Sequence, residues 1–448
     1  MPETSINQQF FEFLQQSTSP FHAVQTMADM LLEAGFEQLH ENQRWNLHAE
    51  QRYFVIREDA ALIAFTLDCP DCLLLGYRMI GAHTDSPGLL LKPRPEVTSN
   101  GYGQLGAEIY GGPLLNTWLD RDLSLAGRIT GVNQHGHLSS RLIDIRRPVL
   151  MIPSLAIHLD RELERSASPD RQKHLVPIFT QLNNSNSTEQ SFHEWLLKEE
   201  SLREETEDLE SILSTSLYCY DPQAPTLFGA REQFISGPRL DNLLSCFVAV
   251  KALTQAQTRQ NRLLICSNHE EIGSTSTTGA DSSFLQSIMT RIIPDDTDRQ
   301  CCLNHSLFIS LDNAHAVHPN HSDRHESGHM PRLNGGPVIK HNAGQRYATS
   351  DISAALVRQL ASESDVSTQD FVMRNDIPCG STIGPRISAQ LGIRTVDVGA
   401  PSLAMHSIRE TTGSSDPLQL FQLIHHFLTR EHVPTINHAG SGLQSSAQ

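Results

Sequence analysis

Hydrophobic residues follow two different periods along most of this chain. Near the N-terminus they recur every three or four positions, in Phe10–Leu14 and Val24–Leu32, which predicts amphipathic helices. Elsewhere, short apolar runs alternate with longer amphipathic segments. The runs predict strands at 53–56, 61–67, 262–267, 306–311 and 394–398, and the amphipathic segments predict helices at 241–256, 279–291, 350–361 and 414–428. This alternation predicts an α/β fold in which helices flank a mixed, largely parallel sheet.

The middle of the chain has a different character. From about residue 94, glycines punctuate short apolar segments as far as Val149, which is typical of β-hairpins. We therefore predict that a mostly β domain, residues 95–234, is inserted into the α/β domain, which is formed by residues 1–94 and 235–448. A chain of 448 residues is long enough for two or three such units.

The charge of the chain disfavours two classes of partner. The sequence has 34 Lys and Arg against 51 Asp and Glu, a net charge of −17. Such an acidic surface repels phosphate backbones and anionic lipids, so we expect neither nucleic acid nor membrane as a partner. No apolar run in the sequence reaches the roughly 18 residues that a membrane span needs.

We expect a cytoplasmic protein. The first residues, MPETSINQQFFEFLQQ, carry Glu3 and no basic segment, so they do not resemble a signal peptide. Eight cysteines scattered along the chain favour reduced thiols over a disulfide framework. The 22 histidines are unusual, and histidine is a common metal ligand.

One histidine stands where a buried strand is expected to end. The apolar run 72–80 leads into Gly81-Ala82-His83, and active-site groups of open α/β sheets usually lie at such strand ends. Asp85 is close enough in sequence to accept a hydrogen bond from the imidazole and fix its tautomer. By itself, the pair also fits a histidine that caps a turn beside an ordinary loop aspartate.

The predicted strand 262–267 leads to two adjacent carboxylates, Glu270 and Glu271. At the mouth of an apolar strand such a pair costs desolvation and repulsion energy unless a cation or a proton compensates. In metal-assisted hydrolysis, one carboxylate can bind the ion while its neighbour takes a proton from the attacking water. The alternative is a loop in which both side chains point into solvent.

Three more residues follow the same logic. Asp312 follows the strand 306–311, His406 lies just beyond 394–398, and Asp241 precedes a helix, where by default it would be the N-cap. Four strand ends that present His83, Glu270 with Glu271, Asp312 and His406 are hard to ascribe to separate structural accidents. Oxygen and imidazole ligands without thiolate favour a catalytic zinc site over a closed structural one. We expect a loop rim near this site to carry His315, His318, His321, His325 and His329.

Seven motifs follow one another between Gly81 and Glu410: GAHTDSPG, PRLDN, NHEEIGS, LDNAHAVHPN, GPVIKHN, RNDIPCGSTIGP and LAMHSIRE. In the order and spacing of these motifs, the chain resembles the aspartyl aminopeptidase family of dinuclear zinc metallopeptidases. A further segment, residues 147–160, matches inside the predicted insertion. The resemblance implies that the inserted domain mediates dimerisation, and that dimers assemble further, as far as a dodecamer.

The resemblance also implies two zinc ions per subunit and a role for each residue around them. Glu270 would be the general base, and Asp85 would orient a metal-binding histidine. The implied ligands are His83 and Asp312 for one ion, Glu271 and His406 for the other, and Asp241 as the bridge between them.

Outside this centre, the resemblance points to two more residues. His158, from the insertion, would reach the active site of a neighbouring subunit and contact the substrate, and a role for His158 as a metal ligand stays open. An acidic substrate side chain needs a cation, for which Lys340 is our candidate and Arg346 and Arg374 are alternatives.

We therefore predict a zinc-dependent aminopeptidase that releases N-terminal residues, acidic ones (Asp or Glu) above all, from short peptides with a free N-terminus. Two other functions fit the same residues. One is a dinuclear zinc amidohydrolase acting on N-acyl amino acids, and the other is a non-catalytic zinc-binding assembly protein. The pair Glu270 and Glu271 disfavours the latter, since metal storage needs no spare carboxylate.

Overall fold

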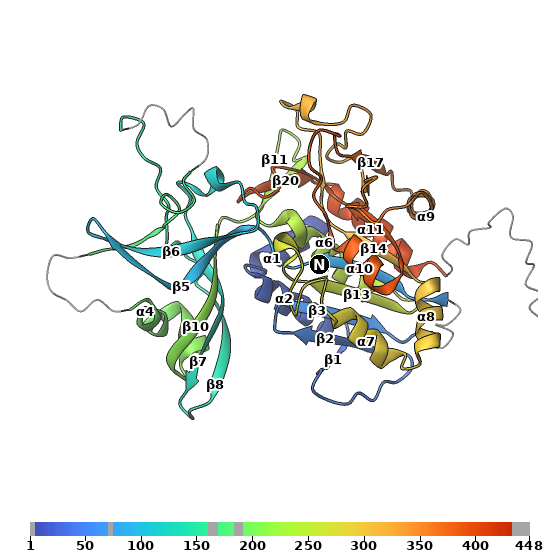
Figure 1. Ribbon diagram of the computed structural model, residues 1–448, viewed down its shortest axis with the longest axis horizontal. Helices are drawn as coiled ribbons and strands as arrows, with labels where there is room; N and C mark the ends of the chain where they lie inside the picture. The colour runs from blue at the N-terminus through green and yellow to red at the C-terminus, as the bar shows by residue number, and fades with distance from the viewer. Residues whose placement is uncertain (1–4, 70–74, 160–168, 183–190, 432–448) are drawn as a thin grey trace, which may run out of the picture.

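The computed structural model describes residues 5–69, 75–159, 169–182 and 191–431. Two bodies lie side by side (Figure 1). The larger, on the right of the view, is a nine-stranded sheet packed between helices, and the other, on the left, is built around a six-stranded sheet. A smaller sheet of five short strands completes the architecture.

The nine-stranded sheet is mixed and largely parallel, which confirms the fold predicted from the hydrophobic pattern. Its four middle strands run parallel to one another, and antiparallel pairs flank them. In spatial order the strands are β1 (Glu37–Leu39), β2 (Arg52–Arg57), β3 (Ala61–Thr66), β13 (Arg262–Ser267), β4 (Arg78–His83), β14 (Leu307–Leu311), β18 (Arg394–Gly399), β16 (Val338–His341) and β17 (Gln369–Val372).

Helices cover both faces of this sheet, because successive side chains of a strand point to opposite faces. In β4, Ile80 and Ala82 belong to the core on one face, and Met79 belongs to the core on the other. The helices of the first face are α1 (Ile6–Gln16), α2 (Pro20–Glu33), α6 (Leu240–Gln255), α9 (Asp351–Glu363) and α11 (Asp416–Thr429). Those of the second face are α7 (Phe284–Ile292), α8 (Asp296–His305) and α10 (Ile383–Leu391).

Helices α7 and α8 are among those that differ from the sequence prediction. The predicted helix 279–291 begins only at Phe284, because the preceding polar segment forms turns: the Ser276 hydroxyl accepts the N–H of Gly279 at 2.9 Å. The hydrophobic pattern does not predict α8 at all. Its only buried residues are Cys302 and Leu303, so it lacks the continuous apolar stripe of an amphipathic helix.

The six-stranded sheet is antiparallel throughout. Its strands in spatial order are β8 (Leu138–Asp144), β7 (Ser124–Asn133), β10 (Leu209–Tyr220), β5 (Gly88–Ser99), β6 (Tyr102–Tyr110) and β9 (Ile178–Gln181). Leu89, Ile129 and Leu217 lie in its core, beside α4 (Phe192–Lys198). Because β5 begins soon after β4 ends, the predicted boundary at residue 94 falls within β5. The division into a catalytic and a dimerisation domain stays a prediction.

The five-stranded sheet lies near the carboxyl ends of the central strands. It consists of β11 (Thr226–Phe228), β12 (Phe234–Gly237), β20 (Glu410–Gly413), β19 (Pro401–Leu403) and β15 (Ala314–His315). Short helices elsewhere are α5 (Arg203–Thr206), η1 (Leu115–Trp118), η2 (Glu200–Leu202), η3 (Glu270–Ile272) and η4 (Ser322–Arg324). No helix in the described part of the chain has the length and apolar character that crossing a membrane requires.

Candidate metal centre

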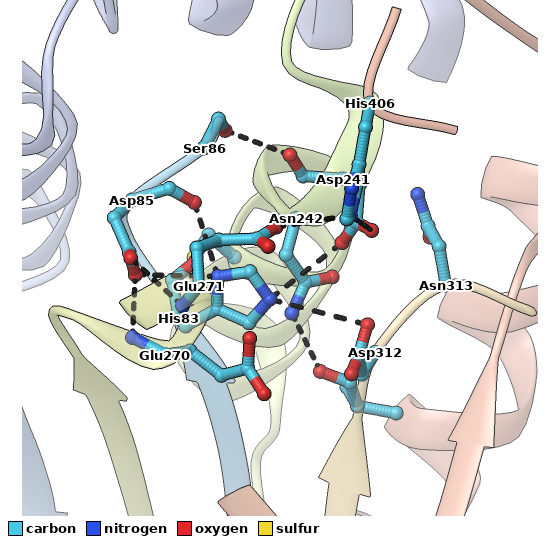
Figure 2. Close-up of polar contacts among 12 residues, drawn as sticks. His83, Asp85, Ser86, Asp241, Asn242, Glu270, Glu271, Asp312, Asn313 and His406 are labelled. Carbon is cyan, nitrogen blue, oxygen red and sulfur yellow. Dashed lines mark hydrogen bonds and ion pairs between the residues drawn. The ribbon is translucent and has the colours of Figure 1, made fainter. Parts of the chain in front are cut away.

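Three neighbouring parallel strands bring functional side chains to one edge of the nine-stranded sheet. β4 ends at His83, β13 leads into the η3 turn with Glu270 and Glu271, and β14 is followed by Asp312. Because the carboxyl ends of parallel strands meet at the same edge, these four side chains converge there. Figure 2 shows them around a common centre.

Asp241 lies beside this group, next to His406 (Figure 2). Its Oδ1 lies 3.6 Å from Nε2 of His83, and its Oδ2 lies 3.7 Å from Nε2 of His406, which comes from the loop between β19 and β20. Although Asp241 stands at the start of α6, the helix has no side-chain cap. The Asp241 side chain is buried instead, and its Oδ1 has no hydrogen-bond partner among the described residues.

Three overlapping sets of groups in the described part of the chain could hold a metal ion. Within each set the ligand atoms lie within 4.8 Å of one another. Imidazole nitrogens and carboxylate oxygens without thiolate are the donors of catalytic zinc sites, so the residues present fit zinc. The sets are His83 with Asp241 and Asp312, Asp241 with Glu271 and His406, and His83 with Glu270 and Glu271.

The electrostatics of the site also call for a cation. Burial, reinforced by Asp312, raises the pKa of Glu270 to about 9, and burial together with Asp241 raises the pKa of Glu271 to about 7. Burial lowers the pKa of His406, but the carboxylate of Glu271, 3.4 Å away, raises it more, to about 10. Protons therefore compensate these carboxylates, and a divalent cation would do so in their place.

Both imidazoles are oriented by a hydrogen bond from Nδ1 to a main-chain carbonyl. Nδ1 of His83 donates to the carbonyl of Asp85 at 3.0 Å, and Nδ1 of His406 donates to that of Gly112 at 3.1 Å. Since a carbonyl oxygen can only accept, the hydrogen is on Nδ1, and Nε2 is left to face the carboxylates. Metal-binding histidines are commonly oriented in this way.

The Asp85 side chain has a wider role than the sequence suggests. Its Oδ1 lies 3.4 Å from Nδ1 of His83, but its main contacts are elsewhere. It accepts the backbone N–H groups of Glu270 and Glu271, each at 3.1 Å, and the Tyr110 hydroxyl at 2.8 Å. Asp85 therefore holds the η3 turn in place, and Tyr110 ties this turn to the six-stranded sheet.

Lys340 lies in β16 beside Asp312. Its Nζ is 3.4 Å from Oδ2 of Asp312, 3.1 Å from the carbonyl of Asn313 and 5.0 Å from the centre of the Tyr347 ring. Burial raises the pKa of Asp312, but Lys340 and His83 together bring it below its ordinary value. Lys340 is only 2% exposed, so a desolvated cation stands at the edge of the site.

The remaining candidates lie outside the convergent group. His158 lies in an exposed turn and belongs to none of the three sets found among the described residues. Arg346 donates to the carbonyl of Cys379 at 3.3 Å, and Arg374 forms a bidentate ion pair with Asp376.

The histidine-rich segment borders a cavity of about 240 Å³ close to the site. His315, His318 and His325 line it together with Met405, the neighbour of His406. The segment therefore lies where the sequence predicts a rim. Its histidines are absent from the three metal-binding sets of the described residues.

Comparison with known proteins identifies one protein family over nearly the whole chain. The model of the aminopeptidase I zinc metalloprotease (M18) family matches residues 13–428. A probable M18 family aminopeptidase 2 from Stutzerimonas stutzeri (strain A1501) is 46% identical over 429 residues, which cover 96% of this chain and 99% of the relative.

Solved structures of similar proteins share the fold. A chain in the cryo-EM structure of the Ape4 and Nbr1 complex has a TM-score of 0.89 and 38% identity, covering 94% of this chain and 84% of that one. The mApe1 structure from Chaetomium thermophilum has a TM-score of 0.84 and 30% identity, covering 94% and 96%. The dodecamer of mApe1 from S. cerevisiae has a TM-score of 0.78 and 26% identity, covering 94% and 96%.

We predict that zinc uptake by the metal-free protein releases protons. The pKa of His406 is raised to about 10 and that of Glu271 to about 7, so at pH 7 both groups carry protons, in full or in part. Because metal ligands bind in their deprotonated forms, about one proton or more should leave per ion, and affinity should rise with pH. Calorimetry at pH 7 in buffers of different ionisation enthalpy measures this release, and zinc binding with no proton release would contradict the assigned ligands.

Proposed function

This chain belongs to the aminopeptidase I zinc metalloprotease (M18) family, and we propose that it uses two zinc ions to release acidic N-terminal residues from short peptides. Membership in a family of aminopeptidases favours this activity over amidohydrolysis of N-acyl amino acids or silent metal binding. The observation that carries the proposal is the position of Asp241. Its buried carboxylate lies between Nε2 of His83 and Nε2 of His406.

Two zinc ions are supported by the way in which the ligand sets overlap. Asp241 belongs to two of the sets: one also contains His83 and Asp312, and the other also contains Glu271 and His406. Because one oxygen of the Asp241 carboxylate faces each imidazole, this carboxylate is placed to bridge two ions. A buried carboxylate oxygen without a hydrogen-bond partner is costly unless an ion binds it. We propose His83, Asp312 and Asp241 for one ion, and Glu271, His406 and Asp241 for the other.

Glu270 is proposed as the general base. Among the described residues its carboxylate forms no hydrogen bond or ion pair, whereas Glu271 is engaged with His406. Bound zinc would lower the pKa of a water molecule and polarise the substrate carbonyl. The Glu270 carboxylate would accept a proton as this water attacks the carbonyl carbon, and would then pass it to the leaving amine nitrogen.

Lys340 is proposed to select acidic substrates. An ammonium group has three N–H donors, and the structure accounts for Asn313 and Asp312 as partners. The third donor would bind the side-chain carboxylate of an N-terminal Asp or Glu. A bound zinc ion would also take the free α-amino group of the substrate as a ligand, which is why we propose peptides with an unblocked N-terminus.

We further propose that the chain self-associates through the six-stranded sheet and that His158 contacts substrate in a neighbouring subunit, not the metal. The segment that carries His158 exposes apolar side chains, with Leu155 52% and Leu159 74% exposed. A groove of about 800 Å³ opens beside it, lined by Met151 and Trp195. Burial of such surface would stabilise a dimer. A dodecamer, as in the mApe1 structure from S. cerevisiae, is the proposed larger assembly.

A cytoplasmic location completes the proposal. The seven cysteines that the structure describes are all free, as expected of a protein in a reducing compartment.

Replacement of Glu270 by Gln should abolish catalysis but not metal binding. We expect kcat for a dipeptide to fall at least about a hundredfold, as loss of a general base implies, while zinc content stays at the wild-type level. Glu271→Gln is the matched control, because it should lose zinc as well as activity. Turnover close to wild type in Glu270→Gln would show that another group takes the proton.

Lys340→Met should weaken acidic substrates selectively. Loss of a charged hydrogen bond predicts a fall of about ten- to a hundredfold in kcat/KM for aspartyl peptides relative to leucyl peptides. Arg374→Met serves as the control for loss of a nearby cation and should leave this ratio unchanged. If kcat/KM fell equally for both substrates in Lys340→Met, Lys340 would not select the substrate and would only stabilise Asp312.

The shared active site can be tested by subunit mixing. His158→Ala and Glu270→Gln should each be inactive, but in a mixed dimer one of the two sites would combine an intact Glu270 with an intact His158. We therefore expect partial recovery of activity after the two variants are dissociated and reassembled together. If verified mixed dimers stay inactive, His158 does not act across the interface.

A further inference from the structure

Glu410, at the start of β20, is a buried carboxylate beside the candidate metal centre. It is 1% exposed. Its Oε2 accepts the backbone N–H of Asp241 at 2.8 Å, and its Oε1 accepts the backbone N–H of His406 at 2.7 Å. One side chain thus joins the main chains of two residues proposed as metal ligands, although they come from different elements.

The chemistry of this pairing requires a carboxylate. No lysine or arginine forms an ion pair with Glu410 in the described part of the chain, so its burial is offset mainly by the two N–H groups. A glutamine has only one acceptor oxygen and would turn its NH₂ group toward one of these donors. An aspartate is shorter by one methylene and could not span the same two groups without movement of the backbone.

The two halves of the site are held in different ways. The strand-held half consists of His83, the last residue of β4, and Asp312, whose N–H donates to the carbonyl of Val398 in β18 at 3.0 Å. The loop-held half consists of Glu271 and His406, which lie in the η3 turn and in the β19–β20 loop.

The loop around His406 is strained and needs external support. His406 has a φ of 68° and Ala404 a φ of 53°, in the left-handed region that residues with a Cβ rarely adopt. Gly112 holds the imidazole, and the N–H of Leu114 donates to the carbonyl of His406 at 2.9 Å. Glu410 is the contact that ties this strained loop to Asp241.

We propose that Glu410 is a positioning residue that sets the metal affinity of the loop-held half by fixing the backbone of His406 against that of Asp241. The strand-held half depends on Glu410 only through the shared ligand Asp241, because the ladder of the nine-stranded sheet holds His83 and Asp312. This inference rests on the proposed function, since it uses the assignment of two ions to the two halves.

The test is a zinc titration of the full-length protein against a competing chelator. In Glu410→Gln, the affinity for one of the two ions should fall about 10- to 100-fold, as loss of an outer-shell partner typically does, while the affinity for the other, which depends on Glu410 only through Asp241, should fall much less. The weakened ion is identified with cobalt: at one equivalent of Co²⁺, the absorption spectrum of Glu410→Gln should match that of His406→Ala.

Asp416→Asn is the matched control for loss of a buried carboxylate in the same region. Asp416 is also 1% exposed and accepts the N–H groups of Asn334 and Gly413, each at 2.9 Å, but neither is a proposed ligand. This variant should lose thermal stability and keep both metal affinities. If Glu410→Gln does not fold, the same zinc titration is done with Glu410→Asp. This variant retains the charge but cannot reach the N–H groups of both Asp241 and His406.

Two results would overturn the inference: both affinities unchanged in Glu410→Gln, or both reduced equally. Either would make Glu410 an ordinary buried polar residue. A wild-type protein that binds fewer than two zinc ions would instead contradict the metal count of the proposed function, so the two failures can be told apart.

Discussion

The site depends on the compensation of buried negative charge around Asp241. This carboxylate lies between two imidazoles, is removed from water and has an oxygen without a hydrogen-bond partner among the described residues. Glu270 and Glu271 crowd the same space, and burial raises the pKa of both. Such an arrangement is stable only with protons or cations in it. The donor set makes zinc the fitting cation, and family membership agrees with this assignment.

The scaffold supports this charge in two ways. Main-chain ladders of the nine-stranded sheet hold His83 and Asp312, so the strand-held half is part of a rigid core. The loop-held half relies on side-chain contacts, among them Asp85 to the η3 turn and Tyr110 from the six-stranded sheet. Because residues 110–117 contact both Asp85 and the His406 loop, the six-stranded sheet is mechanically connected to the metal centre.

The sequence predicts the ends of β4, β13 and β14 well because these strands are largely apolar and each leads directly to polar residues. The run 262–267 coincides with β13, and the convergence of residues after β4, β13 and β14 follows from parallel pairing. Tyr110 and the contact from Glu410 to Asp241 were missed because in each case the partner lies in another element of the fold, so no local pattern marks the contact. The proposed role of His158 involves a second subunit, so no pattern within the single chain predicts it.

The most direct test of the two-ion centre is anomalous diffraction at the zinc edge from crystals of the zinc-loaded protein. We predict two peaks, one on each side of the Asp241 carboxylate, with His83 next to one and His406 next to the other. A single peak, or peaks distant from Asp241, would contradict the bridging role on which this account of the site is built.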